Sequence, residues 1–133
     1  MADRIELEVA TPERLMVQES VEDVQIPGKD GYLGILAGHA PLLGQLGTGV
    51  LSYGLGGHHR SLAVQGGFVE VLPDHVRVLA NVAERSEDID VERAKADLKR
   101  ATDRVSNTEE PDPDAALEAL ALAQARLDST AAH

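Results

Sequence analysis

The chain has 133 residues, a formal net charge of −11 and no cysteine, and 43% of its residues are hydrophobic. This length fits one compact domain, or one domain with a small appendage. The acidic charge argues against a nucleic-acid-binding protein, and the lack of cysteine excludes disulfides, thiol chemistry and cysteine-ligated zinc. No apolar run has the length of a signal-peptide core or of a membrane span, so we expect a cytoplasmic protein that is at most peripheral to a membrane.

Up to residue 86, apolar and polar residues alternate as they do in strands. Ile5, Leu7 and Val9 share one face, and the turn signal Pro73-Asp74 separates two later strand runs as a hairpin tip. No segment of helical length lies between the runs, so crossover helices and a parallel sheet are not expected. The pattern predicts an all-β N-terminal β-sandwich over residues 1–86.

The stretch 31–49 holds six glycines among aliphatic residues, which is typical of short strands and tight corners over an aliphatic core. Its histidine, His39, has two interpretations. It is either a corner residue that bonds to the backbone or a residue that contacts a partner.

After residue 86 the apolar period becomes helical. Asp90 is placed to cap a first helix, which ends near Ser106-Asn107, and Asp112 is placed to cap a second helix. The expected apolar stripe of the first helix is Val91, Ala94, Leu98, Ala101 and Val105, and that of the second is Leu117, Leu120, Gln124 and Leu127. The sequence therefore predicts a C-terminal antiparallel helical hairpin over residues 87–133 that needs the sandwich, or another protein, for stability.

Six short motifs then carry a resemblance over essentially the whole chain. They are 9–12 (VATP), 31–36 (GYLGIL), 38–43 (GHAPLL), 63–71 (AVQGGFVEV), 78–80 (VLA) and 88–94 (DIDVERA). In this order and spacing they make the chain similar to the epsilon subunit of bacterial F-type ATP synthase, which is called delta in mitochondria.

The resemblance implies a non-catalytic rotor subunit in the central stalk of the complex. The sandwich would bind the gamma subunit and the c-ring, and the hairpin would lie on the sandwich or extend to the alpha and beta subunits and inhibit ATP hydrolysis. Membrane contact would come only through the complex, on the cytoplasmic face of the bacterial cell membrane. The residues implied for the gamma and c-ring interface are Gly31, Tyr32, Leu33, Gly34, His39, Pro41 and Leu42. Tyr32 departs from the family, in which many members carry an acidic residue at this position.

The resemblance also implies a nucleotide site in the folded hairpin. Its residues would be Glu84, Ile89, Asp90, Arg93, Ala94, Arg100 and Arg126. Two positions that are arginine in strong ATP binders are Ala115 and Leu122 here, and a triphosphate needs several charged donors. Two interpretations therefore stay open: regulatory ATP binding of physiological strength, or weak or absent binding in which Asp90 serves as a helix cap. No cofactor is expected to be required.

Two other hypotheses compete with the rotor subunit. One is a stand-alone nucleotide-sensing module that acts through the segment 89–94, and the other is a generic β-sandwich interaction protein with a helical tail. An enzyme in its own right is not expected, because the sequence has no nucleophile–base pair, no phosphate-binding glycine loop followed by lysine, and no metal cluster.

Overall fold

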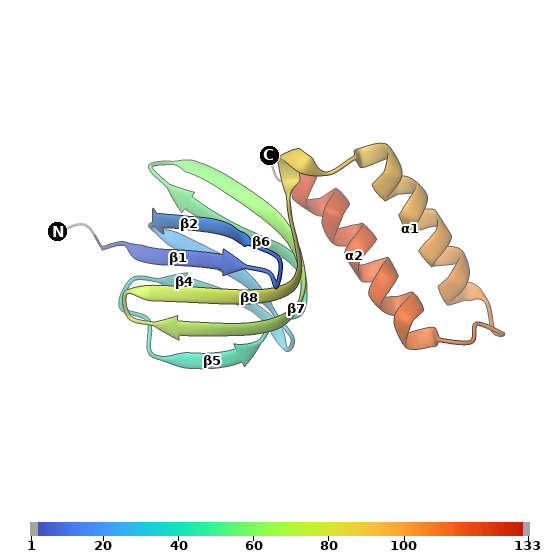
Figure 1. Ribbon diagram of the computed structural model, residues 1–133, viewed down its shortest axis with the longest axis horizontal. Coiled ribbons are helices and arrows are strands. Elements are labelled where there is room, and N and C mark those ends of the chain that lie inside the picture. Colours follow the sequence, from blue (N-terminus) through green and yellow to red (C-terminus); the bar gives the residue numbers. More distant parts are fainter. Residues whose placement is uncertain (1–2, 132–133) are drawn as a thin grey trace.

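The structure is a computed structural model that describes residues 3–131, and it confirms a β-sandwich followed by a helical hairpin (Figure 1). The strands are β1 (Ile5–Ala10), β2 (Leu15–Val21), β3 (Asp23–Gly28), β4 (Gly31–Leu36), β5 (Leu42–Gln45), β6 (Thr48–Leu55), β7 (His58–Leu72) and β8 (His75–Arg85). A short 3-10 helix, η1 (Ser86–Asp88), leads into α1 (Val91–Ser106) and α2 (Pro113–Ala131).

The strands hydrogen-bond in the order β2-β1-β8-β7-β6-β3-β4, and β5 pairs with β7. The long strand β7 pairs with β6 along its first half and with β5 along its second half, while β8 follows it on the other side. Between the two halves lie Gly66 and Gly67, with φ angles of 68° and 124° that favour glycine. The bend at these glycines lets β7 serve both layers of the sandwich.

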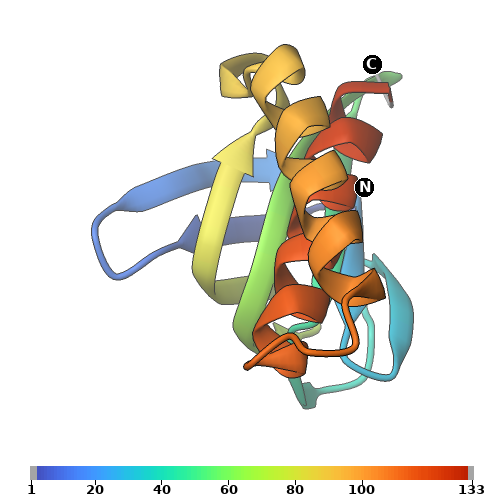
Figure 2. The ribbon, with the colours of Figure 1, turned by 90° about the vertical axis from the view of Figure 1, so that its right-hand side faces the viewer.

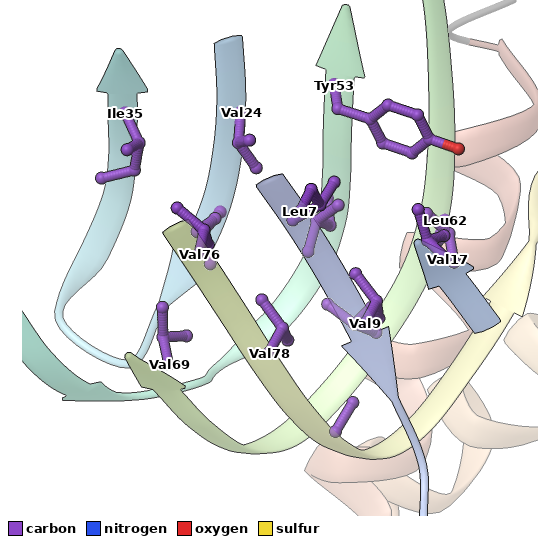
Figure 3. Close-up of a cluster of buried hydrophobic side chains, with 14 of the residues drawn as sticks. Leu7, Val9, Val17, Val24, Ile35, Tyr53, Leu62, Val69, Val76 and Val78 are labelled. Atoms are coloured by element: carbon purple, nitrogen blue, oxygen red, sulfur yellow. The ribbon is translucent and has the colours of Figure 1, made fainter. Parts of the chain in front are cut away.

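Aliphatic side chains fill the space between the layers (Figure 3). The fully buried ones include Ile5, Leu7, Val9, Val24, Ile26, Ile35, Leu51, Leu62, Val64, Val69, Val71, Val76 and Val78. Alternation along each strand puts these residues on the inner face, and Tyr53 is the aromatic residue among the buried set of the described chain. Burial, and then a hydrogen bond with Glu19, raise the pKa of the Tyr53 hydroxyl.

Pairing of the strands agrees with the sequence at one point and differs at another. Leu72 pairs with His75 across the two-residue tip Pro73-Asp74, as predicted. However, β1 and β8 pair in parallel, which the sequence analysis did not expect. The chain between them forms strands β2 to β7 and no helix. A parallel pair could therefore not be predicted from a helical crossover segment in the sequence.

The predicted caps of both helices are confirmed. The Asp90 carboxylate accepts a hydrogen bond from the Arg93 N–H at 3.1 Å, and the Asp112 carboxylate accepts one from the Ala115 N–H at 3.1 Å. The first helix ends at Ser106, as expected.

The expected apolar stripes of the helices are confirmed in part, since Leu98 of α1 and Leu120 and Leu127 of α2 are half-buried. In α1, Ala94 and Ala101 are buried, but Val91 and Val105 are exposed. In α2, Leu117 is 52% exposed. Gln124 is also exposed, and the buried residues are Ala116, Ala123, Ala125 and Ser129. The reason is that α2 lies between α1 and strands β6 and β7, where small side chains allow close approach on two sides (Figures 1 and 2).

Two hydrogen bonds join α2 to the sandwich at its two ends. The Ser61 hydroxyl donates to the Ser129 carbonyl at 3.1 Å, and the Gln65 amide donates to the Glu118 carbonyl at 2.9 Å. The hairpin therefore lies folded against the sheet. Within the described residues, no helix is long and apolar enough to cross a membrane.

Candidate functional site

A pocket of about 240 Å³ lies where the end of β8, η1 and the two helices meet. It is lined by Glu84, Asp88, Ile89, Asp90, Arg93, Ala94, Asp97 and Arg126. Six of the seven residues implied for nucleotide binding therefore line one pocket. The seventh, Arg100, lines an adjoining groove between α1 and α2, and the pocket and the groove share Asp97 and Arg126.

Different elements of the fold position the residues that line the pocket. Asp90 is fixed because it caps α1, and one helical turn further on Arg93 and Ala94 face the same side. Glu84 stands near the end of β8, where the chain leaves the sheet. Arg126 comes from α2 and reaches across to that strand.

The guanidinium of Arg126 joins three elements. Its Nε and Nη2 atoms lie 2.7 Å and 2.6 Å from the same carboxylate oxygen of Glu84 on β8, and its Nη1 lies 3.7 Å from Asp97 on α1. Asp97 also forms an ion pair with Arg100 on the same helix. The side chains of Arg126, Glu84 and Asp97 are all at most one-third exposed, so water screens these contacts only partly.

Negative charge is in excess around this pocket. Its lining holds four carboxylates (Glu84, Asp88, Asp90 and Asp97) and two guanidiniums (Arg93 and Arg126), so the formal sum is −2. The side chain of Leu122 lines the groove and offers no donor. The arrangement suits an uncharged, hydrogen-bonding group such as a nucleoside better than a free polyphosphate.

The set of residues implied for the nucleotide site does not include Asp97, which the sequence marks only as an ion-pair partner of the cations on the first helix. Asp97 lies four residues after Arg93 and three before Arg100, so all three share one side of α1. That spacing predicts that the Asp97 carboxylate lies between the two arginines. The structure shows its ion pair with Arg100.

The residues implied for the partner interface fall in two places. Gly31, Tyr32, Leu33 and Leu42 line a cavity of about 430 Å³ that also contains Lys29 and Asp30. Gly34 is exposed on the same edge strand, β4. His39 and Pro41 lie in the connection between β4 and β5, outside this cavity.

Tyr32, which stands where many family members carry an acidic residue, uses its polar group for a contact within the chain. Its hydroxyl accepts a hydrogen bond from the Val50 N–H at 2.9 Å, although the residue is 61% exposed. The ring passes over Gly49, where an added Cβ would overlap the Tyr32 hydroxyl and stand 2.9 Å from the Pro27 Cβ. With its hydroxyl bonded to the backbone of β6, Tyr32 offers mainly its ring face to the outside.

His39 is half-buried at the corner after β4. Its Nδ1 lies 2.7 Å from the Ala40 carbonyl oxygen, and its backbone N–H donates to the Leu36 carbonyl at 3.2 Å. The geometry is that of a corner residue bonded to the backbone, one of the two interpretations given above.

A patch of exposed apolar residues, which was not predicted from the sequence, consists of Leu43, Phe68 and Leu79. These residues are 74%, 57% and 50% exposed on β5, β7 and β8. Phe68 is paired with Leu79 across the two strands. A signal was available, because Phe68 shares the strand face of Glu70 rather than that of the buried Val69.

Comparison with known proteins identifies the family. The family model for the ATP synthase delta/epsilon chain β-sandwich domain matches residues 4–86. An ATP synthase epsilon chain of Solibacter usitatus is 58% identical over 96% of each chain, and that of Koribacter versatilis is 53% identical over 81% of this chain and 76% of its own.

Solved structures agree with these relatives. A chain in the cryo-EM structure of the Euglena gracilis mitochondrial ATP synthase (OSCP/F1/c-ring) is 26% identical, with a TM-score of 0.84 over 100% of this chain and 84% of that one. A chain of the Tetrahymena thermophila central stalk and c-ring, at 14% identity, has a TM-score of 0.59 over 97% of this chain and 99% of that one, and shows the fold alone. By the family model and by these relatives, the chain belongs to the ATP synthase epsilon chain family.

Proposed function

We propose that this chain couples the gamma subunit to the c-ring in the rotor of an ATP synthase and regulates ATP hydrolysis through its hairpin. In this proposal residues 1–86 bind gamma and the ring, and residues 87–133 form the regulatory element. Membership of the epsilon chain family makes it a non-catalytic subunit of the central stalk. Through its complex it would be peripheral to the cytoplasmic face of the bacterial membrane.

The single observation that best supports the gamma contact is the patch of Leu43, Phe68 and Leu79. Three large apolar side chains stand exposed on three neighbouring strands of a protein whose net charge is −11: Phe68 is paired with Leu79, and Leu43 lies two positions along, opposite Glu70. Large apolar side chains that gather exposed on one face are typical of a protein–protein interface. The cavity beside Tyr32 and Leu42 lies between β5 and the turn that joins β3 to β4, and it supports a second contact, which we assign to the c-ring.

We expect that the double substitution Leu43→Asp with Phe68→Asp abolishes co-purification with gamma. Two carboxylates buried in an apolar contact would cost several kcal/mol, which corresponds to a loss of affinity of about 100-fold or more. The measurement is the amount of gamma and c-ring that the tagged variant retains in a pull-down from the membranes of cells that express it.

A control is Leu117→Asp, which places one carboxylate on a leucine of α2 that is 52% exposed, close to the 57% of Phe68. It should leave gamma binding intact. Retention of gamma by the double variant, with an unchanged circular dichroism spectrum, would contradict the assignment of the patch.

A second candidate function is weak regulatory ATP binding by the folded hairpin. It is favoured by the convergence of Glu84, Asp90, Arg93 and Arg126 on one pocket. The excess of carboxylates and the apolar Leu122 in the adjoining groove oppose the triphosphate.

Isothermal titration calorimetry of the full chain with MgATP tests this function. We expect a dissociation constant in the millimolar range, that is, a binding free energy of about −4 kcal/mol. The variant Arg93→Ala should weaken it further. No heat at millimolar MgATP would rule out the sensor, and micromolar binding would show that the carboxylates do not oppose the phosphates.

A further inference from the structure

We propose that Arg126, held by Glu84 and Asp97, is a built-in latch that keeps the hairpin folded on the sandwich without a bound nucleotide. The inference rests on the proposed regulatory function of the hairpin and concerns what sets its position. The chain's own side chains take the place of a ligand in the pocket.

The contacts of the latch cross the boundary between the two parts of the chain. Arg126 lies in α2, Glu84 lies in β8 of the sandwich, and the hydrogen bond and the ion pair between them measure 2.7 Å and 2.6 Å. Asp97, 3.7 Å from the same guanidinium, ties α1 to this point. When the hairpin leaves the sandwich, the contact between Arg126 and Glu84 must break.

The rest of the interface between the hairpin and the sandwich is less specific. The fully buried residues of α2 are small (Ala116, Ala123, Ala125 and Ser129), and its two other hydrogen bonds to the sandwich join neutral groups. Alanine buries little apolar area, and a neutral hydrogen bond contributes less than a charged one. The partly buried charged contact of Arg126 is therefore the strongest single restraint on the folded hairpin.

The latch also gives a reason why this pocket would bind a triphosphate weakly. A triphosphate needs the guanidinium of Arg126, which Glu84 and Asp97 already neutralise. The incoming phosphates would have to displace two carboxylates and would then lie beside them. Folding of the hairpin is consequently expected to depend on the latch rather than on the concentration of ATP.

Förster transfer between two dyes on the full-length chain tests the latch. Cysteines introduced at the exposed positions Gln18 and Ala96 label the sandwich and α1, and no native cysteine competes. The variant Ser129→Trp gives the reference signal of the released hairpin. Ser129 is a fully buried residue of α2 that contacts Ser61 of the sandwich, so a large side chain there should push α2 off the sheet. The measured quantity is the ratio of released to folded hairpin.

We expect Arg126→Gln and Glu84→Gln each to raise that ratio about tenfold, as the loss of one charged hydrogen bond should. The variant with both substitutions should exceed the single variants by little, because they remove the same interaction. Sodium chloride at about 1 M should raise the ratio of the wild-type chain, though by less than these substitutions because the ion pair is partly buried, and should have little effect on Arg126→Gln.

The matched control is Arg77→Gln. Arg77 also lies between two carboxylates, Glu8 at 3.7 Å and Glu70 at 3.9 Å, but all three belong to the sandwich. The substitution removes the same side chain and charge without touching the hairpin. It should leave the ratio unchanged.

An unchanged ratio in both single variants would overturn the latch and leave alanine packing as the cause of folding. A wild-type hairpin that is released without MgATP and folds when it is added would also overturn it. Failure of the proposed function is seen elsewhere: if the enzyme with the released hairpin of Arg126→Gln hydrolyses ATP at the same rate as the enzyme without a hairpin, the regulation fails while the latch stands.

Discussion

Replacing Gly67 by alanine is expected to lower the free energy of unfolding by about 3 kcal/mol or more. Gly67 has a φ of 124°, a conformation that residues with a side chain rarely adopt. An added Cβ would also overlap the Leu79 carbonyl oxygen and stand 3.0 Å from the Ala80 Cα on β8. Because both obstacles are backbone atoms, the ladder between β7 and β8 would have to open at the bend that β7 makes between the two layers.

The control is Gly44→Ala on β5, where nothing lies within 4 Å of the added Cβ and φ is not in the positive region. That substitution should be neutral, or stabilise slightly by restricting the unfolded chain. Urea unfolding followed by circular dichroism gives both values. A loss below about 1 kcal/mol for Gly67→Ala would show that the bend can relax, against the usual cost of such strain.

The strands could be predicted because their chemistry is local. Alternation of Ile5, Leu7 and Val9, and the tip Pro73-Asp74, depend only on neighbours in the sequence, and the structure agrees. The parallel pairing of β1 with β8 could not be predicted in this way. It joins residues about 70 positions apart, and its register depends on how the intervening strands fold back.

The faces of the helices were harder to predict for a physical reason. A stripe of large apolar residues marks a helix that packs on one side, but α2 packs on two. Its alanines are buried between α1 and the sheet while Leu117 is exposed. In a helix so rich in alanine, hydrophobic size does not show which side is inside.

In the candidate site, too, contacts between sequence neighbours could be predicted, whereas those between distant residues could not be predicted from local spacing. The motif 89–94 predicted a local group, since Asp90 and Arg93 lie one helical turn apart. The resemblance implied that Glu84 and Arg126 belong with it, and 42 residues separate those two. What neither source supplied is the role of Asp97, because an ion pair between helices depends on how the two helices are placed side by side.

Deleting the hairpin after Ser86 is expected to raise the rate of ATP hydrolysis by the assembled enzyme. Only complexes with an extended hairpin are inhibited in the proposed mechanism, so the gain reports the extended fraction. An extended hairpin in about half of the complexes predicts a twofold gain, and one in about nine-tenths predicts a tenfold gain. Steady-state hydrolysis by membranes carrying the truncated or full-length chain measures it. A hairpin that the latch keeps almost wholly folded predicts almost no gain, so an inhibitory hairpin is refuted only if deletion also leaves the rate unchanged in the Arg126→Gln background.

The latch variant Arg126→Gln makes this test sharper because it predicts a change of opposite sign. It keeps both helices but loses the contact with Glu84 that holds them on the sandwich. More hairpins should then extend, and hydrolysis should fall below that of the wild-type enzyme, by up to about tenfold if the shift matches the loss of one charged hydrogen bond. A faster rate in this variant would mean that the folded hairpin, rather than the extended one, restrains the rotor.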